Sequence, residues 1–304
     1  MVATRLAVLV NQWYRERMSQ QSDNPKRELI ETVAIIPARG GKQSIPYKNL
    51  QKLGGRTLLA WAVEVALAAE SVDAVLVSTE DKKIAQEAER LGAIVVPRPK
   101  KYSQPQSSDA GWYSHAVDWM ETEKGWKPEL LVNLRPTSPL RFVYDVEAMV
   151  KYMKNNPQAD GLKSVVSAPI HPYKMWVFAG ENSVNNDESG LSGSQDEDSG
   201  RELAVGGAGT LKGVFDNDFR RLHGPDHPRQ KIQKSWPVYW QDGQVDITRR
   251  RFVLRPECLQ YNNVWGENLH GYVLDPRTST DLDTLEDFHR AEKIYKELQK
   301  ERGN

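Results

Sequence analysis

A basic, glycine-containing loop follows a short apolar run, and these residue types together could bind phosphate. The run is Val33–Ile36, and the loop after it carries Arg39, Gly40-Gly41 and Lys48. No acidic residue occurs from position 32 to position 63. Glycine lets backbone N–H groups approach an anion closely, while Arg and Lys neutralise its charge. The pattern predicts a phosphate cradle, although a solvent-exposed basic turn would have the same composition.

Two carboxylates separated by one residue form a second candidate group. In an extended segment Asp281 and Asp283 point to the same side, and such oxygen ligands suit a hard cation. The same acids precede an apolar helical stripe, where they could instead cap the helix and complement its dipole. Asp287 falls inside that helix, and we assign it a structural role.

The composition narrows the class of protein. The chain has 304 residues, with 41 Lys plus Arg against 41 Asp plus Glu, which argues against a protein that coats nucleic acid. The single cysteine, Cys258, excludes an intrachain disulfide and indicates a reducing compartment. The apolar run Leu6–Val10 is too short for a secretory signal, and no later run could span a bilayer. We therefore expect a cytoplasmic protein that binds neither nucleic acid nor membrane.

Strand-like and helix-like segments alternate from residue 32 to residue 168. The expected strands are Val33–Ile36, Val72–Val77, Ala93–Val96, Leu130–Leu134 and Gly161–Val166. The expected helices are Leu58–Ala69, Glu80–Leu91 with Ser78-Thr79 as possible caps, Ser108–Glu123 and Val143–Met153. This order indicates a parallel sheet covered on both faces, with ligands at the carboxyl ends of its strands. The loops after Ile36, Val77 and Leu134 should then line one crevice.

The pattern changes beyond residue 168. Residues 181–202 are rich in Ser, Gly, Asn and acids, so we expect a mobile loop. Short strand-like pieces follow at Leu211–Phe215, Pro237–Trp240, Gln244–Thr248 and Arg251–Leu254, with Asp242-Gly243 as a tight turn. Residues 169–265 are therefore predicted to form a β-rich insertion in a main domain that covers residues 31–304.

Three further segments complete the chain. The run Arg249-Arg250-Arg251 is interpreted as a solvated edge strand. Leu282–Leu298 has the apolar stripe of a final helix. Residues 1–30 are predicted to be an extension, either disordered or carrying a short helix over 6–18 that docks on the body or a partner.

Four ordered motifs resemble those of the acylneuraminate cytidylyltransferases, the CMP-sialic acid synthetases. IIPARGGKQSIPYKNL, residues 35–50, is similar to the family's IPARGGSKGIPxKN. VSTED at 77–81 resembles VSTDD, RPTSPLR at 135–141 resembles QPTSPLR, and DLDTLED at 281–287 resembles DIDTxED. The related CMP-KDO synthetases lack the double glycine and the Lys-Asn pair in this arrangement, so they fit less well. The motifs extend over nearly the whole chain.

The resemblance implies a reaction and a fold. The anomeric hydroxyl of a nonulosonic acid attacks the α-phosphate of CTP, and pyrophosphate leaves, with Mg²⁺ as the cofactor. The implied fold is α/β, a Rossmann-like nucleotidyltransferase domain whose mainly parallel sheet is flanked by helices. A smaller β-rich dimerisation insertion would exchange across a homodimer.

The resemblance also implies roles for individual residues. The catalytic residues are Arg39, Lys48 and Asp283, and the Mg²⁺ ligands are Asp281 and Asp283. The nucleotide-binding residues are Ala38, Arg39, Gly40, Gly41, Lys42, Lys48, Asn49, Ser78 and Arg98. The acceptor-binding residues are Arg135, Thr137, Ser138, Lys174, Arg229 and Gln230, with Arg229 supplied by the partner subunit. Without the family, Lys174 and Arg229 would also suit ordinary surface positions.

The sequence departs from the family mostly around the sugar. Lys42 stands where the family usually has Ser, which moves a cation by one residue. Arg135 replaces a Gln that contacts the acceptor in the family, so we expect an acceptor with different substituents or with an extra negative group. Trp240-Gln241-Asp242-Gly243 replaces a segment that often reads RPNG. The resemblance therefore implies CTP as the donor and leaves the acceptor open.

Two other functions remain as alternatives. The same fold could use another nucleotide or acceptor, such as a KDO-type acid or a sugar phosphate. A catalytically weak, nucleotide-binding dimeric paralogue would be a different class of protein. The presence of Arg39, Lys48, Asp281 and Asp283 argues against the second alternative.

Overall fold

The computed structural model describes residues 29–41, 45–170, 176–178, 211–213 and 237–303. The chain divides into two compact units, one made of Met1–Val166 with Gln241–Asn304 and the other of Ser167–Trp240. The predicted helix over residues 6–18 and the predicted mobile loop 181–202 lie outside the described residues. Within the described part of the chain, no helix has both the length and the apolar character needed to cross a membrane.

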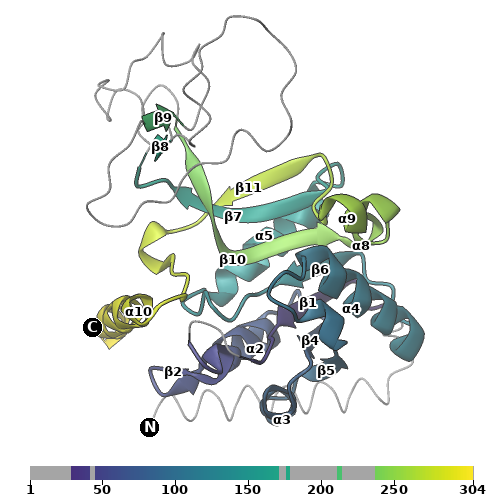
Figure 1. Ribbon diagram of the computed structural model, residues 1–304, viewed down its shortest axis with the longest axis horizontal. Coiled ribbons are helices and arrows are strands. Elements are labelled where there is room, and N and C mark those ends of the chain that lie inside the picture. Colours follow the sequence, from purple (N-terminus) through teal and green to yellow (C-terminus); the bar gives the residue numbers. More distant parts are fainter. Residues whose placement is uncertain (1–28, 42–44, 171–175, 179–210, 214–236, 304) are drawn as a thin grey trace, which may run out of the picture. The chain divides into compact units, whose positions relative to one another are not determined.

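A seven-stranded sheet organises the first unit (Figure 1), in the order β11-β7-β10-β6-β1-β4-β5. Its strands are β1 Thr32–Pro37, β4 Ala74–Thr79, β5 Ile94–Pro97, β6 Leu130–Asn133, β7 Gly161–Ser167, β10 Tyr239–Arg249 and β11 Leu269–Val273. β1 pairs in parallel with β4 and β6, and β4 pairs in parallel with β5. β10 is antiparallel to β6. The expected mainly parallel sheet is confirmed.

Helices cover both faces of this sheet because its strands alternate apolar side chains between the two faces. Ala34 and Ile36 of β1 belong to one core cluster, together with residues of α2 Leu58–Ala68, α3 Lys82–Arg90 and α5 Val143–Asn155. Val33 and Ile35 belong to the other, with α4 Asp109–Lys124, α8 Arg250–Val253 and α9 Pro256–Tyr261. Both cores are built from side chains that water does not reach.

The C-terminal helix, α10 Leu285–Gly303, packs against the segment Lys52–Leu53. The hairpin of β2 Lys52–Leu53 and β3 Arg56–Thr57 contributes Leu53 to a third apolar cluster. Leu282 and Ala291 belong to the same cluster. This packing holds the segment before α10 beside the loop that follows β1.

The second unit is described only in part. β8 Trp176–Phe178 and β9 Leu211–Gly213 form a two-stranded antiparallel sheet. The predicted dimerisation role of this region remains a prediction.

Most expected elements before residue 168 are confirmed, with small shifts at their ends. β4 begins at Ala74 rather than at residue 72, and α10 begins at Leu285 rather than at residue 282. α3 is capped by Asp81, whose Oδ1 accepts from the N–H groups of Lys83 and Ile84, rather than by Ser78-Thr79. The short elements α9 and β11 were not predicted.

The predicted turn at Asp242-Gly243 is wrong. β10 continues through both residues as one strand of 11 residues. Asp242 is buried, and its carboxylate accepts hydrogen bonds from Ser164 Oγ at 2.5 Å and Gln244 Nε2 at 2.7 Å. Ser164, which is distant in the sequence, and the neighbouring Gln244 replace the solvent that a turn aspartate would contact, so the strand extends.

The predicted solvated edge strand at Arg249-Arg250-Arg251 is also wrong. β10 lies between β7 and β6, and the strand expected at 251–254 is instead the short helix α8. Arg249 is 2% exposed and donates to the carbonyl oxygens of Ala159, Met153 and Asn156 at 2.8–3.0 Å. A guanidinium can be buried here because the carbonyl groups at the end of α5 need donors.

Candidate active site

The loop after β1 is held by the ends of neighbouring elements. Ala38 N–H donates to the carbonyl of Ser78 at 3.0 Å, which ties the loop to the end of β4. Gly40 N–H donates to the carboxylate of Glu80 at 2.8 Å. A Cβ at Gly40 would lie 2.7 Å from Cβ of Asp81, so only glycine fits this close approach. The loop is therefore fixed in place at the carboxyl ends of β1 and β4.

Arg39 and Asn49 hold the two sides of this loop together. Arg39 Nη1 donates to the carbonyl of Gln104 at 3.2 Å, and Asn49 Nδ2 donates to the carbonyl of Arg39 at 2.9 Å. Arg39 thus stands between the loop and the segment before α4.

Arg98 and Ser78 lie together beneath the loop. Arg98 donates through Nε to Ser78 Oγ at 3.0 Å and through Nη2 to the Ser78 carbonyl at 2.7 Å. Its guanidinium lies 5.6 Å from the ring centre of Trp112. Burial lowers the pKa of Arg98 to about 10, which still leaves the group charged at neutral pH. In this geometry Arg98 braces the end of β4.

Lys48 meets the C-terminal acid pair across the fold. Its ammonium lies 2.7 Å from Oδ1 of Asp283, and the two residues are 235 positions apart. The Lys48 side chain is 5% exposed, whereas that of Asp283 is 69% exposed. The structure therefore joins the predicted phosphate loop to one of the predicted metal ligands.

Asp281 and Asp283 do not cap α10, because two residues that follow them, Thr284 and Asp287, form the cap. Asp287 Oδ2 accepts from the N–H of Thr284 at 2.8 Å, and Thr284 Oγ1 accepts from the N–H of Asp287 at 3.2 Å. This reciprocal pair is a capping box that begins α10, in agreement with the structural role expected for Asp287. The acid pair lies just before the box, and burial together with the Asp283 charge raises the pKa of Asp281.

The loop after β6 brings the predicted acceptor residues to the same edge. The carbonyl of Thr137 accepts from Leu282 N–H at 3.0 Å, between the two acids. Ser138 is buried, and its hydroxyl lies 3.4 Å from the Asp242 carbonyl. Arg135 Nη2 donates to Asp109 Oδ2 at 2.6 Å. Burial alone would lower the pKa of Arg135, but the Asp109 carboxylate outweighs it and the pKa rises.

Four predicted site residues lie outside the described residues, namely Lys42, Lys174, Arg229 and Gln230. The sequence analysis also missed two contacts of this region. Glu80 accepts from both Gly40 N–H and Ser103 Oγ, and Asp109 pairs with Arg135. Glu80 lies within a quoted motif and was open to prediction. Asp109 follows Ser108 at a helix start and is not distinguishable from a capping residue in the sequence.

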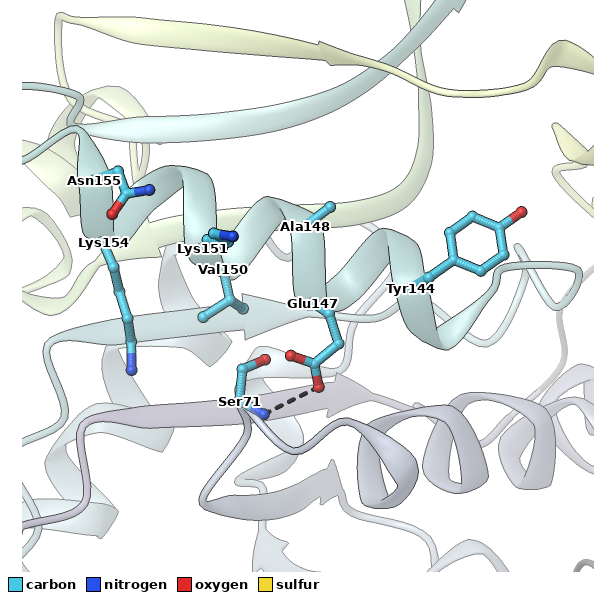
Figure 2. Close-up of a pocket in the computed structure, with 8 residues that line it drawn as sticks. All are labelled: Ser71, Tyr144, Glu147, Ala148, Val150, Lys151, Lys154 and Asn155. Carbon is cyan, nitrogen blue, oxygen red and sulfur yellow. Dashed lines mark hydrogen bonds between the residues drawn. The ribbon is translucent and has the colours of Figure 1, made fainter.

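An open cavity of about 470 Å³ lies elsewhere, along α5. Figure 2 shows Glu147 pointing to Ser71, whose N–H donates to it at 3.0 Å, with Lys151 and Lys154 farther along the helix. Ser71 precedes β4, so the cavity borders the amino ends of the parallel strands. None of the predicted site residues lines it. Ligands of open α/β sheets bind at the opposite ends, where the Gly40 loop lies.

Comparison with known proteins agrees with this geometry. Residues 33–179 match the family model described as cytidylyltransferase. Over these residues, just under half of its length, the chain is similar to the cytidylyltransferases. The resemblance of its motifs to acylneuraminate cytidylyltransferases is thereby confirmed at the level of relatives.

The curated relatives of this chain carry several names. An N-acylneuraminate cytidylyltransferase of Escherichia coli is 25% identical over 259 residues, 85% of this chain and 51% of that protein. A CMP-N,N'-diacetyllegionaminic acid synthase of Legionella pneumophila is 32% identical over 153 residues, 48% of this chain and 62% of that protein. A 3-deoxy-manno-octulosonate cytidylyltransferase of Anaeromyxobacter is 31% identical over 141 residues, 46% of this chain and 52% of that protein. The chain thus spans about half the length of the N-acylneuraminate and 3-deoxy-manno-octulosonate cytidylyltransferases that it matches.

A solved structure shows the same fold. The synthetase of CMP-2-keto-3-deoxy-manno-octonic acid, complexed with CTP, matches with a TM-score of 0.55 and 16% identity. The match covers 88% of this chain and 99% of that one. At this identity the likeness supports the nucleotidyltransferase fold and nothing finer.

Proposed function

We propose that this protein transfers CMP from CTP to an acidic α-keto sugar of the nonulosonic type and releases pyrophosphate. The observation that carries the proposal is the 2.7 Å contact between Lys48 and Asp283. It joins a basic glycine loop to a carboxylate pair at the carboxyl edge of the sheet. The match to the cytidylyltransferase family supports CTP as the donor.

The chain's own residues supply positioning and charge. The loop at Gly40-Gly41 receives the triphosphate, while Arg39 and Lys48 face its negative charge. The sugar's anomeric oxygen forms a bond to the α-phosphorus as the bond to the β-phosphate oxygen breaks. Pyrophosphate carries away the electron pair, and the hydroxyl proton passes to solvent. Fixed cations favour this step because charge builds up on the leaving group.

Asp281 and Asp283 would hold Mg²⁺. Both are carboxylates, the donors that this cation prefers, and they lie two residues apart in the segment before α10. Bound there, Mg²⁺ would neutralise charge on the phosphate oxygens. Among the described residues, no cluster of three or more His, Cys, Asp or Glu could hold a metal.

The proposal also includes the acceptor sugar, the oligomeric state and the cellular location. The relatives are named as enzymes of sialic, legionaminic and octulosonic acids, which are all acidic sugars. A homodimer, with Arg229 of the partner reaching the acceptor, and a cytoplasmic location complete the proposal.

Pyrophosphate release tests this function. The protein is incubated with CTP, Mg²⁺ and each of several sialic, legionaminic, pseudaminic and octulosonic acids, with mass spectrometry of the product. We expect a CMP-sugar with at least one acid, and none without Mg²⁺ or in Asp283→Ala. No product with any acid and any of the four nucleoside triphosphates would overturn the proposal.

Thermal unfolding separates the enzyme from a protein that only binds nucleotide. We expect CTP with Mg²⁺ to raise the Tm of the wild type, since a ligand that binds only the folded state stabilises it. Asp283→Ala should lose this shift. An unchanged shift in Asp283→Ala, together with no product, would favour the binding protein.

A further inference from the structure

Tyr47 has a backbone conformation that a residue with a bulky side chain rarely adopts. Its φ and ψ angles are 48° and 42°, in the left-handed region. Among the described residues, Asn262 is the only other non-glycine residue with a positive φ. Asparagine tolerates this region because its short side chain can form local hydrogen bonds, whereas a tyrosine there is strained. Such strain persists only where the surrounding structure holds it, and it is concentrated at functional positions.

The left-handed residue turns the chain from solvent into the interior. Tyr47 is 38% exposed, whereas the next residue, Lys48, is 5% exposed. Lys48 begins a single helical turn, and the N–H of Leu50 closes this turn by donating to the Tyr47 carbonyl at 2.8 Å. From the turn, the ammonium of Lys48 reaches Asp283. The strained residue therefore comes directly before the cation on which the candidate active site depends.

The ring of Tyr47 is held by a side chain of the neighbouring helix α3. The ammonium of Lys83 lies 4.8 Å from the centre of the ring, which is within the range of a cation–π contact. The backbone of Lys83 is itself fixed by the helix cap, since Asp81 Oδ1 accepts from its N–H at 2.8 Å. The contact is made with the ring, so it does not require the phenolic hydroxyl.

The start of α3 thus holds the loop after β1 at two places. At the first, Gly40 donates to Glu80, and a Cβ on Gly40 would clash with Asp81. At the second, the Tyr47 ring contacts Lys83. Both places belong to one short segment of the chain, so the two ends of the loop share one support.

We propose that Tyr47 is a positioning residue, whose left-handed backbone and ring contact with Lys83 keep the Lys48 turn in its binding form before the nucleotide arrives. The inference rests on the proposed function and adds a residue that acts through Lys48. A loop that visits other conformations binds its ligand more weakly, in proportion to the fraction that is competent. Loss of the ring should therefore weaken nucleotide binding and leave the reaction of the bound complex intact.

Tyr47→Gly is the first test, because glycine adopts the left-handed conformation without strain but has no ring. Calorimetry measures the dissociation constant of CTP with Mg²⁺, and steady-state kinetics use an acid that gives a CMP-sugar in the pyrophosphate-release test. We expect the dissociation constant and the KM for CTP to rise about fivefold or more, with kcat within about twofold of the wild type. Tyr47→Phe keeps the ring and should behave as the wild type.

Lys83→Met tests the other side of the contact. It keeps the aliphatic stem and removes the charge, so the dissociation constant of CTP should rise about two- to fivefold, the usual effect of an exposed cation–π contact. In the Tyr47→Gly background the same substitution should cause no further loss, because the contact is already absent. Lys82→Met, at the neighbouring exposed position of α3, is the matched control and should leave the constant unchanged.

Hydrogen exchange measures the turn without any nucleotide. The N–H groups of Leu50 and Gln51 donate to the carbonyls of Tyr47 and Lys48, so their exchange reports on the closed turn. We expect this exchange to be about fivefold faster or more in Tyr47→Gly than in the wild type. The difference should shrink when CTP and Mg²⁺ are bound. Should Tyr47→Gly fold poorly, Tyr47→Asn replaces it, because asparagine also tolerates the left-handed region.

Each contrary result has a distinct meaning. A lower Tm in Tyr47→Gly, with the CTP dissociation constant and the exchange at residues 50–51 unchanged, would show that Tyr47 only stabilises the fold and would overturn the inference. A lower kcat at unchanged KM would also overturn it, because Tyr47 would then act in the chemical step. If the wild type neither binds CTP nor forms a CMP-sugar, the proposed function fails. Faster exchange in Tyr47→Gly would then still support its hold on the turn, and equal exchange would overturn it.

Discussion

Lys48 and Asp283 illustrate how single side chains make this site. Lys48 is nearly buried on a short helical turn, Lys48–Leu50, while Asp283 is exposed just before α10. Because Lys48 is nearly buried, its ammonium is held in one position. The exposed Asp283 carboxylate remains accessible to a ligand from solvent. A buried ammonium needs a charged partner, and Asp283 supplies one from the surface.

Lys48→Met should lower kcat/KM by about 100-fold or more, because a fixed cation at developing charge contributes that much in comparable sites. The fold should survive, since Met keeps the buried aliphatic stem. Steady-state kinetics with CTP and an acid that gives a CMP-sugar in the pyrophosphate-release test would measure the loss. Lys52→Met, on an exposed position of β2, is the matched control. Equal kinetics in the two variants would contradict the role of Lys48.

At the start of α3, one residue has two structural roles. Asp81 caps this helix through two backbone N–H groups and also packs against Gly40. A helix cap therefore forms one wall of the phosphate loop.

Asp81→Ala should lower the free energy of unfolding by about 1 kcal/mol, the usual effect of losing an N-cap. Urea unfolding would measure the change. Ser108→Ala is the control, because Ser108 occupies the N-cap of α4 without a capping hydrogen bond from its side chain. Similar losses in both variants would show that the Asp81 hydrogen bonds do not stabilise the helix.

The end of β10 depends on one buried guanidinium. Arg249 connects the strand to the last carbonyl groups of α5 and to Glu129. It thus joins a strand, a helix end and a loop that are distant in the sequence.

Arg249→Met should lower the free energy of unfolding by about 3 kcal/mol, because it removes three hydrogen bonds that a buried guanidinium donates to carbonyl groups. Arg251→Met, in the same run of arginines, should change it by less than about 0.5 kcal/mol. The Arg251 side chain is 56% exposed, and its contact with Asp160 is 3.4 Å long. Equal effects in thermal unfolding would refute the assignment.

The stability of the whole molecule should depend on the ionisation of Asp145 in α5. Burial, and then the charges of Asp242 and Asp275, raise its pKa from 3.8 to about 6. The folded state therefore binds this proton more tightly than the unfolded state. The resulting stabilisation is complete below pH 3.8 and is lost as the pH rises through about 6.

Asp145→Asn should remove this dependence. Relative to the wild type, the variant should be more stable by about 1 kcal/mol at pH 7.5, after allowance for solvent screening, and equal to it at pH 4. Unfolding curves at the two pH values measure the difference. A difference that does not change with pH would show that Asp145 does not titrate in this window.

The features of the fold that could be predicted from the sequence are those that depend on residues close together in the chain. Val33–Ile36 is uniformly apolar, which identifies a strand buried on both faces, and the helix at 58–68 repeats with a helical period. The turn predicted at Asp242-Gly243 was wrong because the hydrogen bond from the buried Ser164 outweighs the local turn preference of these two residues. Arg249 was predicted to lie on a solvated edge strand because a run of three arginines does not show which of the side chains is buried.

The sequence by itself determined the glycine-containing loop after β1, the parallel sheet and the resemblance to the cytidylyltransferases, because these depend on residue types within short segments. Only the tertiary structure decided that Lys48 meets Asp283, that Asp287 rather than the acid pair caps α10, and that Asp109 balances Arg135. Each of these depends on contacts whose partners are set by packing, or on which of several similar side chains reaches a backbone group. Charge complementarity shows that a cation needs a partner, but only the folded chain selects which one.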